Sequence, residues 1–161
     1  MLVHRLRDNA SHVWQKGPTS GRNELRGADT FNLQRFVDAQ NGIYQQVCAE
    51  LRRGQKESHW MWFVFPQIQG LGHSSMSQKY AISSRQEAKA YLNHPLLGQR
   101  LRECTGIVNH IEGSSIGEIF GYPDDLKFHS SVTLFSEVAP DGIVFHEALR
   151  NTSVVSWIRR R

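Results

Sequence analysis

Hydrophobic positions from Thr30 to Leu149 recur mostly every three or four residues, which is the spacing of one face of an α-helix. The clearest stripe has steps of 4, 3, 4 and 3 and joins Leu97, Leu101, Cys104, Val108 and Ile111. It predicts the longest helix of the chain. Two earlier stripes predict one helix with Leu33, Phe36, Val37 and Gln40 and another with Tyr44, Val47, Cys48 and Leu51.

Polar residues and glycines between these stripes indicate where the early helices begin and end. Thr30 or Asn32 is expected to cap the first helix, and the Asn41-Gly42 pair to break it. Gly54 is expected to end the second helix after two arginines that complement its dipole.

Two later helices are expected to begin with capping boxes, a serine followed three residues later by a glutamate. These are Ser84 with Glu87 and Ser115 with Glu118. Pro95 suits the first turn of the long helix.

The most hydrophobic stretch, residues 60–65, is an aromatic run that ends at Pro66. Tryptophan, phenylalanine and valine also favour β-strands, so a buried strand is the competing interpretation. The run has no hairpin signal beside it and its neighbours are helical, which favours a buried helix ending at Pro66. It is far shorter than the roughly 20 residues that cross a bilayer.

The whole pattern predicts an all-α fold, a compact multi-helical array of roughly six to eight short helices in a single domain. Further helical segments are expected at residues 77–80 and 143–149, and from about Asp124 to the residue before Ala139. We expect residues 1–29 to form a flexible N-terminal extension, 30–149 the all-α domain, and 150–161 a divergent basic tail.

Charge argues against a nucleic-acid-binding domain. The chain carries a net charge of +4, yet residues 30–149 contain 10 lysines and arginines against 12 aspartates and glutamates. The positive charge therefore lies in the two tails, and no specific nucleic-acid binding is expected. No segment reaches membrane length, and Cys48 and Cys104 are interpreted as buried thiols of a reducing compartment, so the protein is expected to be cytoplasmic without a membrane partner.

Most familiar enzyme classes lack support in this sequence. The eight histidines are scattered without the spacing of metal ligands, and there is no Gly-x-Ser-x-Gly elbow. Gly70-Leu71-Gly72 lacks the lysine of a P-loop and does not follow a predicted strand. No metal and no cofactor are predicted.

Two clusters remain as candidates for a site. In the first, His59 is a possible acid, base or ligand donor beside Trp60, and Gln67 precedes a glycine loop that suits an anion. The competing interpretation makes His59 a local hydrogen-bonding group and the tryptophans core residues. In the second, Lys127 and Ser130 share a helical face and suit a phosphate or carboxylate. The competing interpretation is a solvated face, with Asp124-Asp125 complementing the helix dipole.

These residues also carry a resemblance to a known family. The strings Leu33-Gln34-Arg35-Phe36-Val37-Asp38-Ala39-Gln40 and Ser58-His59-Trp60-Met61-Trp62-Phe63-Val64-Phe65-Pro66-Gln67, with His94-Pro95-Leu96-Leu97-Gly98, resemble the domain of unknown function 1810 family from about Thr30 to Leu149. The resemblance implies a small, mainly bacterial, all-α protein without an established activity. Some members carry a calpastatin label, which does not suit a compact domain. Residues 150–161 depart from the family pattern.

The polar positions that the family shares exceed what packing needs; they are Asp38, Gln40, Ser58, His59, Gln67, Tyr80, His94, Lys127, Ser130 and Thr133. We therefore expect a domain that binds, and in one version turns over, a small anionic metabolite such as a nucleotide or phosphorylated compound. His59 is the catalytic candidate, and the ligand-binding candidates are Trp60, Trp62, Gln67, Tyr80, Lys127 and Ser130. The alternative is a non-catalytic helical protein-interaction module, and the oligomeric state is left open.

Overall fold

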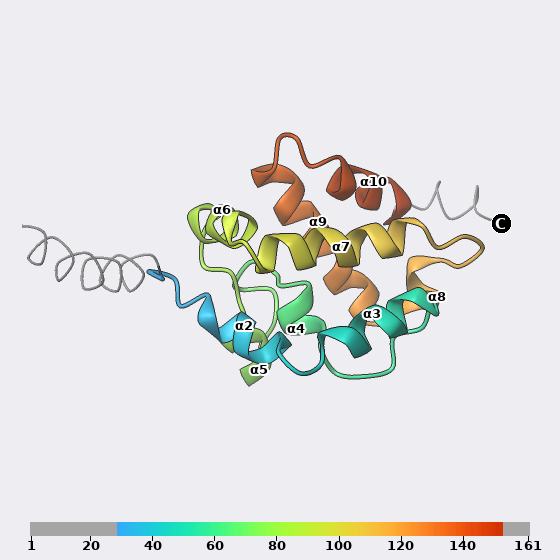
Figure 1. The fold of residues 1–161 in the computed structure, drawn as a ribbon, viewed down its shortest axis with the longest axis horizontal. Coiled ribbons are helices and arrows are strands. Elements are labelled where there is room, and N and C mark those ends of the chain that lie inside the picture. Colours follow the sequence, from blue (N-terminus) through green and yellow to red (C-terminus); the bar gives the residue numbers. More distant parts are fainter. Residues whose placement is uncertain (1–28, 153–161) are drawn as a thin grey trace, which may run out of the picture. The chain divides into compact units, whose positions relative to one another are not determined.

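The structure is a computed structural model that describes residues 29–152. This part of the chain contains nine helices and no strand, which confirms the all-α prediction with more helices than expected (Figure 1). The helices are α2 (Gln34–Gln40), α3 (Tyr44–Arg52), α4 (Met61–Val64), α5 (Ser75–Lys79), α6 (Arg85–Asn93), α7 (Leu97–Asn109), α8 (Ile116–Phe120), α9 (Asp124–Val138) and α10 (Ile143–Thr152). The predicted flexible extension, up to residue 28, and the tail from residue 153 lie outside the described residues.

Residues 29–34 belong to a first unit, and Arg35 begins a second unit that holds the rest of the described chain. Within the first, the carboxylate of Asp29 accepts hydrogen bonds from the backbone N–H groups of Leu33 and Gln34. Asp29 thus supplies the capping oxygens that the sequence analysis assigned to Thr30 or Asn32.

In the second unit, α7 packs against α10, α6 and α3, and it lies between α10 and α3 in Figure 1. Its buried face follows the predicted stripe, with Leu97, Leu101, Cys104 and Val108 almost fully buried. Ile111 lies beyond the helix end. The prediction that α7 is the longest helix is wrong, because α9 has 15 residues and α7 has 13.

Helix α9 is the centre of an aromatic core. Helices α4, α6, α8 and α10 all pack on it. The ring of Phe128 stacks on Phe120 at 4.7 Å and meets the edge of Phe65 at 5.0 Å, and Phe135 contacts Tyr91 at 5.4 Å. Edge-on and offset ring pairs of this kind add to the hydrophobic contribution of burial.

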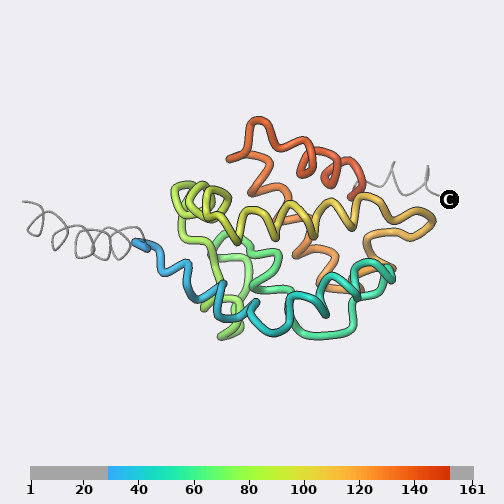
Figure 2. Tube along the Cα trace, in the orientation of Figure 1, coloured from blue at the N-terminus to red at the C-terminus, as the bar shows by residue number. Residues whose placement is uncertain are grey.

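The aromatic run is helical, as favoured, but α4 is only four residues long. Trp60 before it and Phe65 after it are both fully buried outside the helix. From α4 to α6 the chain then follows a mostly irregular path (Figure 2). Backbone hydrogen bonds from Ile82 to Gln67 (2.8 Å) and from Gln69 to Ile82 (2.9 Å) close this segment into a loop.

The two predicted capping boxes differ in how completely they form. Ser115 and Glu118 form the complete capping box. Ser84 caps α6, but the carboxylate of Glu87 accepts hydrogen bonds from Ser83 and pairs with Arg35, so that box is only half formed.

Pro95 precedes α7 and is not in its first turn. The Nδ1 atom of His94 accepts hydrogen bonds from the N–H groups of Leu96 and Leu97, both at 3.2 Å, and so caps this helix. No helix within residues 29–152 has the length and apolar character needed to cross a membrane.

Candidate functional site

The corner that leads into the aromatic run is organised by a buried carboxylate on α3. Glu50, 1% exposed, accepts hydrogen bonds from the backbone N–H groups of Glu57 and Ser58, from the Ser58 hydroxyl, and from Trp60 Nε1 at 2.8 Å. Burial alone would raise the pKa of Glu50, but these hydrogen bonds outweigh it and lower the pKa to about 2. An ionised Glu50 therefore holds the corner, and Trp60 is fixed in the core.

Two lysines from different segments meet at one aspartate next to this corner. The Lys56 ammonium lies 2.8 Å from Asp124 Oδ2, and the Lys127 ammonium lies 3.2 Å from Asp124 Oδ1. Lys56 also donates to the carbonyl of Ser58 at 2.6 Å. Two positive charges thus share one negative charge, and the three side chains are between 7% and 21% exposed.

Trp62 joins this charged group to the loop that follows α4. The Lys127 ammonium lies 4.8 Å from the centre of the Trp62 ring, a cation–π arrangement. Trp62 also lines a small hollow together with Gln67, Ile68, Gly70, Gly72, Ser77 and Tyr80. Of the predicted residues, Gln67 and Tyr80 therefore line a hollow together with Trp62, and Lys127 lies over the Trp62 ring.

Steric constraints explain why two positions of this loop are glycine. Gly70 has φ +94°, which favours glycine. At Gly72 a Cβ atom would lie 2.5 Å from Ser77 Oγ, so any side chain there would displace the loop. The hollow beneath them has a free volume of about 10 Å³, near the least that holds one water molecule.

An unusual feature of the group is the indole nitrogen of Trp62. Although the residue is partly exposed, its Nε1 atom is shielded from solvent and has no hydrogen-bond partner among residues 29–152. A buried N–H group without an acceptor costs about 1–3 kcal/mol. Trp60, two residues earlier, has its N–H satisfied by Glu50.

The other predicted residues, His59, Trp60 and Ser130, do not line this hollow. His59 is exposed on the corner, and Ser130 is half-buried on α9, three residues after Lys127. Trp60 is fully buried, so its side chain has no surface to offer a ligand. The described residues contain no cluster of three or more histidine, cysteine, aspartate or glutamate side chains suited to a metal ion.

Glu50 and Lys56 were not predicted as site residues, and Asp124 was interpreted only as a charge at a helix N-terminus. Asp124 does begin α9, but its carboxylate also joins the two lysines. Lys56 lies in a polar stretch without periodicity, so nothing in the local pattern distinguishes it. The pairing depends on α9, whose first residue, Asp124, lies next to Lys56.

A second polar cluster lies between α3 and α7. Both cysteines are buried, and the Cys104 thiol donates to Tyr44 Oη at 3.9 Å. Tyr44 in turn donates to Glu103 at 2.7 Å. The pKa of Cys48 is lowered to about 6, chiefly by its interaction with the neighbouring Cys104 thiol, against the effect of burial. The thiols are shielded from reagents in solution, as expected for structural cysteines.

The fold and this surface define a small all-α domain in which a partly exposed tryptophan lies beside two lysines that share one aspartate. The chain belongs to the family described as "Protein of unknown function (DUF1810)", whose model matches residues 30–153. This confirms the resemblance found in the sequence.

The chain is also similar to a solved structure, the conserved hypothetical protein Rv1873 from Mycobacterium tuberculosis. The two are 56% identical, with a TM-score of 0.75 over 76% of this chain and 87% of that one. No curated protein matches. Neither description names a ligand or a reaction.

Proposed function

We propose that this protein is a cytoplasmic domain that binds a small anionic metabolite, such as a nucleotide or a phosphorylated compound. The binding surface is the Trp62–Lys127 surface, defined as Trp62, Gln67, Tyr80, Lys127 and Lys56. The observation that carries the proposal is the convergence of two lysines on Asp124 next to a partly exposed indole ring.

The charge of this group suits an anion. Lys56 and Lys127 together carry two positive charges and Asp124 carries one negative charge, so the group keeps an excess of one positive charge. The Lys127 side chain is 21% exposed, which leaves its ammonium open to a phosphate or carboxylate from solution. Lys56, at 7% exposed, adds to the local potential without contacting the ligand.

Trp62 contributes in two ways. Its ring supplies an apolar face on which a nucleobase or other flat group can stack. Its Nε1–H has no acceptor among residues 29–152, so it can donate a hydrogen bond to the ligand. The hollow holds little more than one atom, so the body of the ligand lies outside it, over Gln67, while Tyr80, which is 6% exposed, only lines the hollow.

Ser130 follows Lys127 by one turn of α9 and is the further candidate for an anion contact. His59 is the candidate acid or base for turnover; it is exposed on the corner. We propose binding only. If the bound compound is also turned over, turnover should require His59, whereas binding alone should not.

The test is a thermal-shift screen of the purified protein with inorganic phosphate, ribose 5-phosphate, AMP and ATP. A ligand that binds the native state raises the melting temperature by mass action. We expect a rise in the wild type and in Lys89→Gln, a change of an exposed lysine on α6, and no rise in Lys127→Gln. A flat screen with a cooperatively melting wild-type protein overturns the proposal and favours the protein-interaction module.

A further inference from the structure

A larger cleft lies away from the Trp62–Lys127 surface, where α3 and α7 both end. Its volume is about 700 Å³, within the range of small-molecule sites. We call it the α3–α7 cleft; its lining residues are Arg52, Arg53, Gly54, Gly106, Ile107, His110, Ile111, Glu112 and Ser114. None of them was singled out as a site residue by the sequence.

Positive charge lines the α3 side of this cleft. Arg52 and Arg53 are the last residue of α3 and the residue that follows it. Their guanidinium groups lie 3.8 Å from Glu103 and 3.6 Å from Glu57, and make no hydrogen bond within residues 29–152. Both side chains are more than half exposed, so these ion pairs are weak and their donors are open to a carboxylate.

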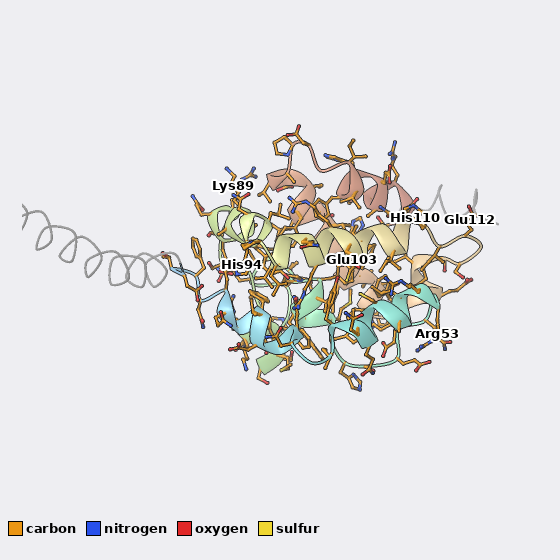
Figure 3. The ribbon with its side chains drawn as sticks, viewed as in Figure 1. Arg53, Lys89, His94, Glu103, His110 and Glu112 are labelled. Atoms are coloured by element: carbon orange, nitrogen blue, oxygen red, sulfur yellow. The ribbon has the colours of Figure 1, made fainter. Side chains whose placement is uncertain are left out.

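The α7 side has the opposite character. Glu112 is exposed and makes no ion pair with any residue that the structure describes. His110 Nδ1–H donates to the carbonyl of Gly106 at 2.7 Å, which holds the imidazole against the end of α7. Figure 3 draws Arg53 below, near the end of α3, and His110 and Glu112 above, near the end of α7. The cleft therefore has a positive rim and a negative rim.

The floor between the rims is apolar and open. It is formed by Ile107, Ile111 and Gly106, all in or directly after the last turns of α7. Glycine is among the least favourable residues inside a helix. No packing contact requires it at Gly106, because the nearest atom that a Cβ would meet there, in Val144, is 3.9 Å away. Gly106 therefore lines the cleft with backbone alone.

We propose that the α3–α7 cleft binds a small zwitterion, an amino acid with an aliphatic side chain. Its carboxylate contacts Arg52 and Arg53, its ammonium group contacts Glu112, and its side chain lies over Gly106 against Ile107 and Ile111. The site is independent of the Trp62–Lys127 surface and uses none of its residues.

The test compares three probes of similar shape by ¹H–¹⁵N NMR titration of the full chain at millimolar concentration. L-leucine has both charges, 4-methylpentanoate lacks the ammonium group, and 3-methylbutylamine lacks the carboxylate. We expect L-leucine to shift the backbone signals of Arg52, Arg53 and residues 106–114, and the other two probes to bind at least about tenfold more weakly. No shift with L-leucine, or equal binding of 4-methylpentanoate, overturns the proposal.

Two variants separate binding from folding. Gly106→Leu places a side chain at the floor, and its Cβ atom meets nothing nearer than Val144 at 3.9 Å, so we expect a folded protein that has lost the L-leucine shifts. Arg53→Gln should weaken L-leucine about tenfold, whereas Arg85→Gln, a control at an equally exposed arginine paired with Glu137, should not. A folded Gly106→Leu protein that binds L-leucine like the wild type overturns the assignment, whatever the outcome at Lys127.

Discussion

The ammonium group of Lys127 lies 3.2 Å from Asp124, three residues earlier on α9, and 4.8 Å from the centre of the Trp62 ring. One side chain thus connects an acidic helix start with an aromatic surface. Lys56 occupies the other oxygen of the same carboxylate. This shared aspartate sets the charge of the surface and is the first feature to test.

Asp124→Asn should affect stability and anion binding in opposite directions. The change removes the charge that compensates two partly buried lysines, so we expect the free energy of unfolding to fall by about 2 kcal/mol. The same loss raises the positive potential, so AMP should bind several-fold more tightly at low salt. Urea unfolding and calorimetric titration measure the two effects. Weaker AMP binding in a folded variant would contradict the charge argument.

The two tryptophans of the aromatic run offer a matched pair of substitutions. Trp60→Phe removes an N–H that donates to Glu50, so we expect a loss of about 2 kcal/mol in the free energy of unfolding. Trp62→Phe removes an N–H without a partner and keeps a ring, so the loss should be below about 1 kcal/mol, while the stabilisation by AMP should decrease. Equal destabilisation by both changes would show that Trp62 is also satisfied in the free protein.

Glu50 should make the protein sensitive to acid in a defined window. Its pKa is about 2 in the folded protein and 4.5 as a reference for the unfolded chain. Between these values the unfolded chain binds a proton that the folded protein does not, so stability should fall as the pH is lowered from 4.5 towards 2.

The control for this pH dependence is Glu50→Gln. It should be less stable at neutral pH and should lose this part of the slope, because the ionisable group is gone. Urea unfolding at several pH values measures both effects. A variant with the wild-type slope between pH 4.5 and 2 would place the dependence on other carboxylates.

The helices and their caps were predictable from the sequence only in part. The stripe from Leu97 to Val108 and the Ser115–Glu118 box were correctly predicted because both depend on neighbours within one helix. The length of α4 was not, because Trp60 and Phe65 are held by distant partners. The same limit applies to the capping role of Glu87, whose carboxylate pairs with Arg35.

The residues of the candidate site were also predictable only in part. Trp62, Gln67, Tyr80 and Lys127 stood out by residue type and by the family pattern, and they lie together. Glu50 and Lys56 did not stand out, because their importance comes from partners on other elements. Long-range pairing leaves no periodic trace in a single sequence.

The aromatic core gives a further test of the fold. Phe128 is fully buried against Phe65 and Phe120, so Phe128→Ala should lower the free energy of unfolding by about 4 kcal/mol. Leu126, two residues earlier on the same helix, is 54% exposed, and Leu126→Ala should change it by no more than about 0.5 kcal/mol. Urea unfolding compares the two. Similar losses would mean that α9 presents a different face to the core.

Anion binding at the Trp62–Lys127 surface is tested most directly by a calorimetric titration of AMP into the wild-type protein, Lys127→Gln and Lys89→Gln at low ionic strength. We expect the wild type and Lys89→Gln to bind AMP alike, and a folded Lys127→Gln protein to bind it at least about tenfold more weakly. Equal affinity in all three proteins would contradict anion binding at the Trp62–Lys127 surface.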